Sequence, residues 1–139
     1  MVSFPEHDFS RDSEKEMDSL RQTLERLRMD GKVAVAIVYG SYAAGTPHSR
    51  SDIDLALYLK ADNDAEAMEL VDQILMATET DVSILRLDDE DESPFVVQEA
   101  LKGIHLVDPD LETLYAVSHR VLHECEGIRF RRKLSVGQD

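Results

Sequence analysis

Two apolar runs separated by a short polar segment constrain the fold of this chain more than any other feature. The first run, KVAVAIVYG at residues 32–40, has the length and apolar content of a buried strand. In that strand Val33, Val35 and Ile37 are predicted to share one face, and Ala34, Ala36 and Val38 the other. The second run, residues 51–59, alternates in the same way. One predicted face carries Ile53, Leu55, Leu57 and Leu59, and the opposite face carries Asp52, Asp54, Ala56 and Tyr58. The pattern predicts two strands, of which the second carries two carboxylates at its start.

These carboxylates predict a metal site. Asp52 and Asp54 project from the same side of the strand, about 7 Å apart at the backbone, because a strand rises about 3.3 Å per residue. A third acidic residue, Asp81, heads the strand-like run DVSILRL after an intervening helix, and a neighbouring strand would bring it to the same end of the sheet. Oxygen ligands suit Mg²⁺ and Mn²⁺, and two such ions about 3.5 to 4 Å apart stabilise both oxygens of an in-line displacement.

The polar segment between the two runs begins with Gly40 and Ser41. Gly40 permits a sharp turn, and Ser41 can present its hydroxyl and backbone amide to phosphate oxygens. A helix N-cap is an alternative role for Ser41. The segment is not a Walker P-loop, because no Gly-Lys-Ser/Thr follows its glycines. Together with the aspartates, it predicts a site for a nucleoside triphosphate and its metal ions.

The pattern Gly-Ser, ten residues, Asp-x-Asp and a later strand aspartate resembles the nucleotidyltransferase core of the DNA polymerase β superfamily. In particular, the short chain resembles the minimal nucleotidyltransferases (MNT), including the MNT antitoxins encoded beside HEPN toxins. The resemblance covers residues 33–103 and is sharpest over residues 39–57. The fold it implies is α/β (α+β), a small mixed β-sheet packed by helices.

The resemblance also implies a role for each site residue. Gly40 and Ser41 hold the triphosphate of ATP, and Asp52 and Asp54 bind both Mg²⁺ ions. Asp81 completes the metal site and helps to deprotonate the attacking hydroxyl. All five positions are filled in this sequence.

The reaction implied is transfer of AMP from ATP to a hydroxyl, with release of pyrophosphate. The implied acceptor is a tyrosine of a cognate HEPN ribonuclease toxin, so that this protein is the antitoxin. Three alternatives stay open, one of which is a nucleotidyltransferase that acts on nucleic acid, for which this acidic chain has the wrong charge. A small-molecule nucleotidyltransferase of the aminoglycoside type uses the same core, but such enzymes usually carry an added domain, for which 139 residues leave little room. A non-catalytic antitoxin would act by binding alone.

The net charge of −14, from 29 acidic and 15 basic residues, bears on the partner. Nucleic acid is normally bound by basic surfaces whose contacts release counterions, so direct binding of nucleic acid is disfavoured. A basic protein partner is favoured, because complementary charge speeds encounter. The Arg-x4-6-His signature of HEPN ribonucleases is absent, so the toxin is expected to be a separate chain in a hetero-oligomer.

A cytoplasmic location without membrane contact is expected. The single cysteine, Cys125, excludes an internal disulfide and fits a reducing compartment. No apolar run approaches the eighteen or so residues of a membrane span, and the first ten residues lack the features of a signal peptide.

Helices are predicted to complete a single domain over residues 1–139. Ser13 and Glu16 have capping-box spacing ahead of an apolar stripe that Gly31 can close: Met17, Leu20, Leu24 and Leu27. The helix at residues 64–77 is predicted to turn inward Met68, Val71, Ile74 and Leu75. Ser93-Pro94 opens a short helix that precedes a brief strand, IHLV.

The last helix is predicted from about Asp110 to near Gly127, followed by a flexible tail. Its apolar stripe comprises Leu111, Leu114, Val117, Val121 and Leu122. The tail gathers Arg129, Arg131, Arg132 and Lys133 in an otherwise acidic protein. Basic residues are stabilised near a helix C-terminus, although contact with a partner or a nucleotide phosphate is an alternative role.

Overall fold

The computed structural model describes the backbone of residues 4–40 and 52–137, and the side chains of residues 15–40 and 52–129. In chain order its elements are α1 (Phe4–Met29), β1 (Val33–Tyr39), β2 (Ile53–Leu59), α2 (Asp64–Leu75), β3 (Val82–Arg86), α3 (Pro94–Ala100), β4 (Ile104–His105) and α4 (Leu111–Gly137). None of the helices in this described part combines the length and the apolar content needed to cross a bilayer.

The four strands form one mixed sheet in the order β3-β2-β1-β4, which confirms the predicted fold class. β1 runs antiparallel to both β2 and β4, whereas β2 and β3 are parallel. A parallel pair needs a crossover connection, and α2 provides it. The end of β1 and the beginnings of β2 and β3 therefore meet at one edge of the sheet.

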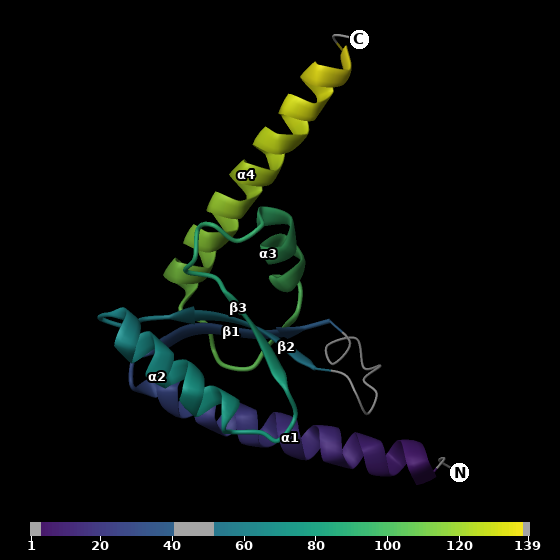
Figure 1. Cartoon of the computed structure of the whole chain (residues 1–139), viewed down its shortest axis with the longest axis vertical. Helices are drawn as coiled ribbons and strands as arrows, with labels where there is room; N and C mark the ends of the chain where they lie inside the picture. The colour runs from purple at the N-terminus through teal and green to yellow at the C-terminus, as the bar shows by residue number, and fades with distance from the viewer. Residues whose placement is uncertain (1–3, 41–51, 138–139) are drawn as a thin grey trace.

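Helices cover both faces of the sheet, with α1 and α2 on one side and α3 and α4 on the other (Figure 1). The alternation of β2 sends Ile53, Leu55 and Leu57 into the core beneath α1 and α2, as predicted. Ala56 lies in the second core, which includes residues of α3 and α4 such as Val97 and Val121. Asp54 shares the face of Ala56, so the second core continues toward this carboxylate.

The faces of β1 are predicted correctly only in its second half. Val35 and Ile37 share one core, and Ala36 and Val38 the other, but Val33 packs with Ala36 and Val38. The pairing of β1 with β2 shifts register between Val33 and Val35, at a bulge or irregularity. An extra residue in a strand reverses the alternation on one side of it, which a period of two cannot anticipate.

The start of α1 differs from the prediction. The helix already begins at Phe4, so Ser13 is not an N-cap and no capping box forms with Glu16. The apolar stripe is confirmed: Leu20, Leu24 and Leu27 are buried, and Met17 packs against them. Gly31, with φ of 76°, lies in the turn that follows the helix, where its amide donates to the Arg28 carbonyl.

The inward face of α2 is rotated relative to the prediction. Met68 is 64% exposed and Leu75 is 40% exposed, so both assignments are wrong. The buried residues are Ala67, Leu70 and Ile74. The Asn63 side chain accepts a hydrogen bond from the Glu66 amide at 2.8 Å, and this N-cap fixes the start of the helix.

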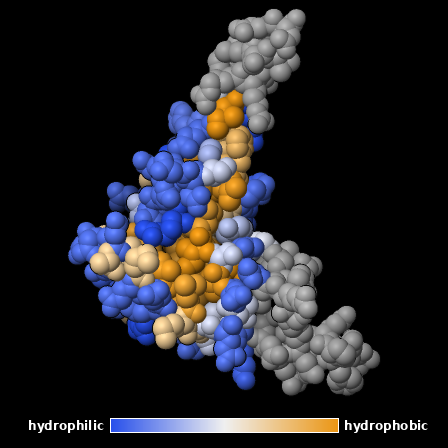
Figure 2. All heavy atoms as spheres, in the orientation of Figure 1, coloured by the Kyte–Doolittle hydropathy of each residue, from blue (hydrophilic) through white to orange (hydrophobic). Residues whose placement is uncertain are grey.

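The last helix is longer than predicted. α4 continues to Gly137, so the predicted end near Gly127 is wrong, and the helix extends well beyond the body of the molecule (Figure 1). Leu111 and Leu122 are 54% and 45% exposed, because the buried stripe consists of Val117, Val121 and Cys125. On the face drawn in Figure 2, apolar side chains gather over the middle of the molecule and continue along α4 between hydrophilic ones.

Candidate active site

The three predicted carboxylates are brought to one edge of the sheet. Asp54 is the second residue of β2, Asp52 directly precedes that strand, and Asp81 directly precedes β3. The pairing of Ile53 with Val82 places Asp52 and Asp81 level with each other. The Ile53 amide also donates to the Asp81 backbone carbonyl at 2.9 Å, so the backbones of the two segments are joined beside these acidic residues.

Gly40 lies directly against the Asp54 side chain. Gly40 follows β1 with φ of 74°, a left-handed conformation that L side chains rarely adopt. A Cβ atom at this position would collide with Asp54 Oδ2 and would lie 3.3 Å from Asp54 Cγ. The glycine is thus required both for the turn and for the space that the carboxylate occupies.

The predicted phosphate ligand Ser41 lies outside the described residues, so its role stays a prediction. The same holds for the rest of the segment up to Ser51.

Negatively charged side chains lie close together at this edge of the sheet, and they shift the pKa of Asp54. Burial raises the pKa of Asp54, and the neighbouring charge of Asp52 raises it further. Both effects disfavour the ionised form of Asp54. A cation at this edge would relieve this repulsion.

Tyr39 is a site residue that the sequence reasoning did not single out. It is paired with Asp54 across β1 and β2, and its ring packs at the margin of the second core. The pKa of its phenol is raised by burial, and then by the charges of Asp54 and Glu92. The sequence did contain a signal for Tyr39. It directly precedes Gly40 and follows the alternation of Val35 and Ile37, which places its ring on the same face of β1 as those residues.

Glu92 belongs to the acidic run of residues 87–93, which connects β3 with α3. Its charge acts on the phenol of Tyr39, so this end of the run lies near the carboxylate edge. Glu92 and its neighbours line a cavity of about 460 Å³ between the β3–α3 connection and α4, together with His123 and Glu124.

Asp52 and Asp54 suit Mg²⁺, although the side chains do not form a closed cage. Within the described residues, no three His, Cys, Asp or Glu side chains are grouped closely enough to hold a metal ion. Such a cage is not required, because Mg²⁺ keeps several waters and usually takes one or two carboxylates together with substrate phosphates. The paired aspartates and their mutual repulsion match that donor set.

A cavity of about 530 Å³ adjoins the carboxylates. Asp52 and Asp81 line it together with Val82, the end of α2 at Leu75 and the turn of residues 78–80. The cavity therefore connects the carboxylate edge with the side of the sheet that carries α2.

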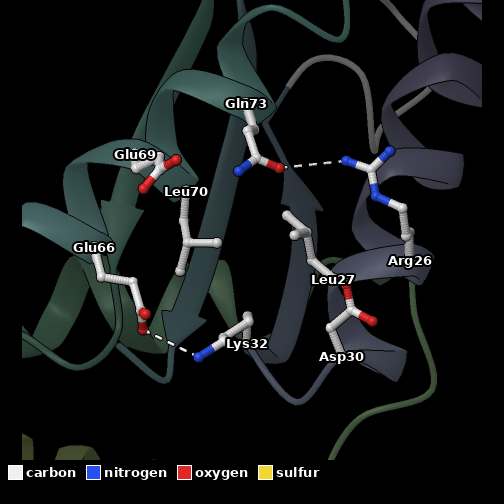
Figure 3. A pocket seen from close by; sticks show the side chains of 8 residues that line it. All are labelled: Arg26, Leu27, Asp30, Lys32, Glu66, Glu69, Leu70 and Gln73. Atoms are coloured by element: carbon white, nitrogen blue, oxygen red, sulfur yellow. Dashed lines mark hydrogen bonds and ion pairs between the residues drawn. The ribbon is translucent and has the colours of Figure 1, made fainter. Parts of the chain in front are cut away.

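A third cavity, of about 460 Å³ and also polar, lies at the other end of β1 (Figure 3). Two contacts cross the cavity: Lys32 Nζ, just before β1, lies 3.2 Å from Glu66 Oε1 of α2, and Arg26 of α1 donates to Gln73 of α2 at 3.3 Å. These contacts tie α2 to α1 and to the turn that follows α1, and the cavity is remote from the carboxylates.

The comparison with known families agrees with this geometry. The sequence profile of the family described as Polymerase beta, Nucleotidyltransferase matches residues 21–112, more than half of the chain. The chain therefore belongs to the polymerase β nucleotidyltransferase family. No curated protein sequence gives a significant match.

Several solved structures share the fold. A toxin-antitoxin with AMP-PNP has a TM-score of 0.63 at 20% identity, over 85% of this chain and 96% of that one. A mutant toxin-antitoxin MntA-HpeT has a TM-score of 0.60 at 20% identity, over 81% and 90% of the two chains. The toxin-antitoxin MntA-HepT has a TM-score of 0.57 at 15% identity, over 86% and 95%. At these identities the likeness establishes the fold alone.

Proposed function

We propose that this protein transfers AMP from ATP to a tyrosine hydroxyl of a HEPN toxin, and that the transfer inactivates the toxin. The observation that carries the proposal is the sheet edge itself. There the Asp54 side chain packs against Gly40, and its charge is repelled by that of Asp52. Asp54 lies on β2, which pairs with β3, the strand that begins directly after Asp81.

In the proposed reaction, Asp81 accepts the proton of the attacking hydroxyl, whose oxygen forms a bond to the α-phosphorus of ATP. The bond from this phosphorus to the oxygen that bridges to the β-phosphate breaks, and pyrophosphate leaves with the electron pair. Gly40 and Ser41 align the triphosphate for this in-line displacement.

Asp52 and Asp54 are the proposed ligands of the divalent ions. Asp81 is proposed to join them when the ions are bound, since without ions no three acidic side chains of the described residues are close enough to hold one. When bound, these ions neutralise negative charge at the reacting phosphates. The raised pKa of Asp54 describes the protein without a cation, and a bound cation favours the ionised carboxylate.

The toxin as partner is supported by three observations. Several solved structures with the same fold are described as toxin-antitoxins, and one of them contains AMP-PNP, an ATP analogue. The net charge of −14 favours a basic protein over a nucleic acid as the partner. The chain itself lacks the Arg-x4-6-His signature, so the toxin would be a second chain.

The direct test uses ATP labelled at the α-phosphate, Mg²⁺, this protein and the HEPN protein encoded beside its gene. We expect the label on the HEPN protein, a mass increase of one or more AMP units, and release of pyrophosphate. If no HEPN reading frame lies beside the gene, or if the label stays on ATP, the proposal is wrong.

The same assay separates catalysis from inhibition by binding. The double variant Asp52→Asn/Asp54→Asn is expected to bind the toxin but to leave its mass unchanged and to fail in rescuing growth. Full rescue by this variant, with no change in toxin mass, would identify a binding antitoxin instead.

A further inference from the structure

The connection between α2 and β3 is held to α1 by one carboxylate, that of Glu16. Glu16 Oε2 accepts hydrogen bonds from the backbone amides of Glu79, at 2.9 Å, and Thr80, at 3.2 Å. The Thr80 amide also lies 3.2 Å from the Thr78 hydroxyl. Figure 1 shows this connection passing beside α1 before it enters β3. A single side chain of α1 thus fixes two successive amides of the turn.

Asp81 is the next residue along the chain. Its side chain is exposed, so the position of its carboxylate depends mainly on the backbone that carries it. That backbone has two neighbouring attachments: the Glu16 contact on one side, and the hydrogen bond from Ile53 to the Asp81 carbonyl on the other. Ile53 itself separates Asp52 from Asp54, so the turn, the third carboxylate and the first two form one connected unit.

We propose that Glu16 is a positioning residue for the active site: by holding the turn of residues 78–80, it sets the placement of Asp81 relative to Asp52 and Asp54. The inference rests on the proposed function only for the role of Asp81 in transfer, and the hydrogen bonds stand independently of it. A carboxylate that accepts two N–H groups forms charge-assisted bonds, which are stronger than neutral ones.

The same turn forms part of the wall of the cavity that Asp52 and Asp81 line. Movement of the turn would therefore change both the position of the Asp81 carboxylate and the shape of the cavity beside it. Displacement of a reacting group by about 1 Å can cost on the order of a hundredfold in rate, so an anchor of this kind bears on catalysis without touching the substrate.

Three variants test the proposal. Glu16→Ala removes the acceptor, Glu16→Gln keeps an acceptor oxygen but loses the charge, and Glu25→Ala is the control. Glu16 is partly exposed, and Glu25 is an exposed acid of the same helix. Glu25→Ala therefore changes the net charge by the same amount as Glu16→Ala. If Glu16 acts only through long-range charge, the Gln and Ala variants should behave alike. If it anchors the turn, the Gln variant should lie between wild type and the Ala variant.

The first measurement is hydrogen exchange at single amides in the intact protein. In Glu16→Ala, the Glu79 amide is expected to lose most of its protection, and the Thr80 amide less, because Thr78 remains as an acceptor. Amides in the middle of β1 and β2 should keep their protection, which shows that the fold is intact. Unchanged exchange at Glu79 would overturn the proposed anchor.

The second measurement is binding of Tb³⁺, detected through energy transfer from tyrosine, for which Tyr39 beside Asp54 is placed. Substitution of a residue that supports metal ligands typically weakens metal binding about 10- to 100-fold, and we expect Glu16→Ala to fall in that range. Glu25→Ala should bind as wild type does. Equal affinity of Glu16→Ala and wild type would contradict a role in placing the carboxylates.

The transfer assay distinguishes failure of this inference from failure of the proposed function. If wild type transfers AMP, Glu16→Ala should lose rate at saturating ATP by about 10- to 100-fold, with partial recovery in Glu16→Gln. Unchanged transfer in Glu16→Ala would reject the inference alone. If wild type transfers nothing, the proposed function fails, while the exchange and Tb³⁺ measurements still decide whether Glu16 positions the acidic edge.

Discussion

The carboxylate of Asp54 occupies the space that a side chain at Gly40 would fill. The residue that follows β1 and the acidic residue near the start of β2 are therefore matched in shape. In the proposed site, this contact places the metal ligand beside the backbone that receives the triphosphate.

Gly40→Ala tests this contact, and the chain provides a matched control. Gly31 has φ of 76°, close to the 74° of Gly40, but a Cβ at Gly31 would meet nothing within 4 Å. Both substitutions should cost about 1–2 kcal/mol of unfolding free energy for the left-handed backbone. Gly40→Ala should also displace Asp54 and abolish transfer, whereas Gly31→Ala should keep it. Chemical denaturation and the transfer assay measure the two effects, and equal activity of both variants would contradict the contact.

Asp54→Asn should separate activity from stability. The folded state raises the pKa of Asp54 through burial and the charge of Asp52, so the ionised form destabilises the fold at neutral pH. A neutral Asn removes this penalty, and we expect the melting temperature to stay the same or rise. Loss of several kcal/mol of charge stabilisation should lower transfer about a hundredfold or more. A large fall in melting temperature would show instead that Asp54 stabilises the fold.

Stability should fall in acid, partly through Glu66. The Asp62 amide and Lys32 hold the pKa of Glu66 below its ordinary value of 4.5. A group whose pKa is lowered by folding contributes stability above its ordinary pKa, and this contribution is lost as pH falls through the folded-state value. Asp110, whose pKa is lowered by the Thr113 hydroxyl and then by Lys60, acts in the same direction from an ordinary value of 3.8.

Urea denaturation between pH 7 and pH 3 measures this effect. Glu66→Gln should be less stable than wild type at neutral pH and should lose less stability below pH 4.5. The control is Glu69→Gln, an exposed acid on the same helix. If the pH profiles of Glu66→Gln and wild type are parallel throughout, Glu66 does not contribute.

Association with the proposed toxin partner should slow as salt rises. Exposed charges are screened beyond about 8 Å at physiological ionic strength, so a partner attracted by the net charge of −14 loses this steering. Stopped-flow binding at increasing salt gives the rate, and Glu90→Gln/Asp91→Asn should reduce both the rate and its salt dependence. Tight binding of RNA in low salt without the toxin would point to a nucleic-acid acceptor instead.

The sequence by itself determined the elements that local pattern controls. The alternation of β2 placed Ile53, Leu55 and Leu57 in the core beneath α1 and α2, and the apolar stripe of α1 placed Leu20 and Leu24 in the same core. Regular periodicity has a single solution when one face is buried, so these predictions needed no knowledge of the rest of the chain.

Only the tertiary structure decided the contacts that join distant segments. The register shift in β1, the rotation of α2 and the length of α4 depend on which neighbours each element packs against. Glu16 shows the difference most clearly, because its spacing from Ser13 predicted a local cap, yet its carboxylate binds amides 63 and 64 residues away. A helix that already begins at Phe4 has no free amides for such a cap, so this carboxylate is available to the turn before Asp81.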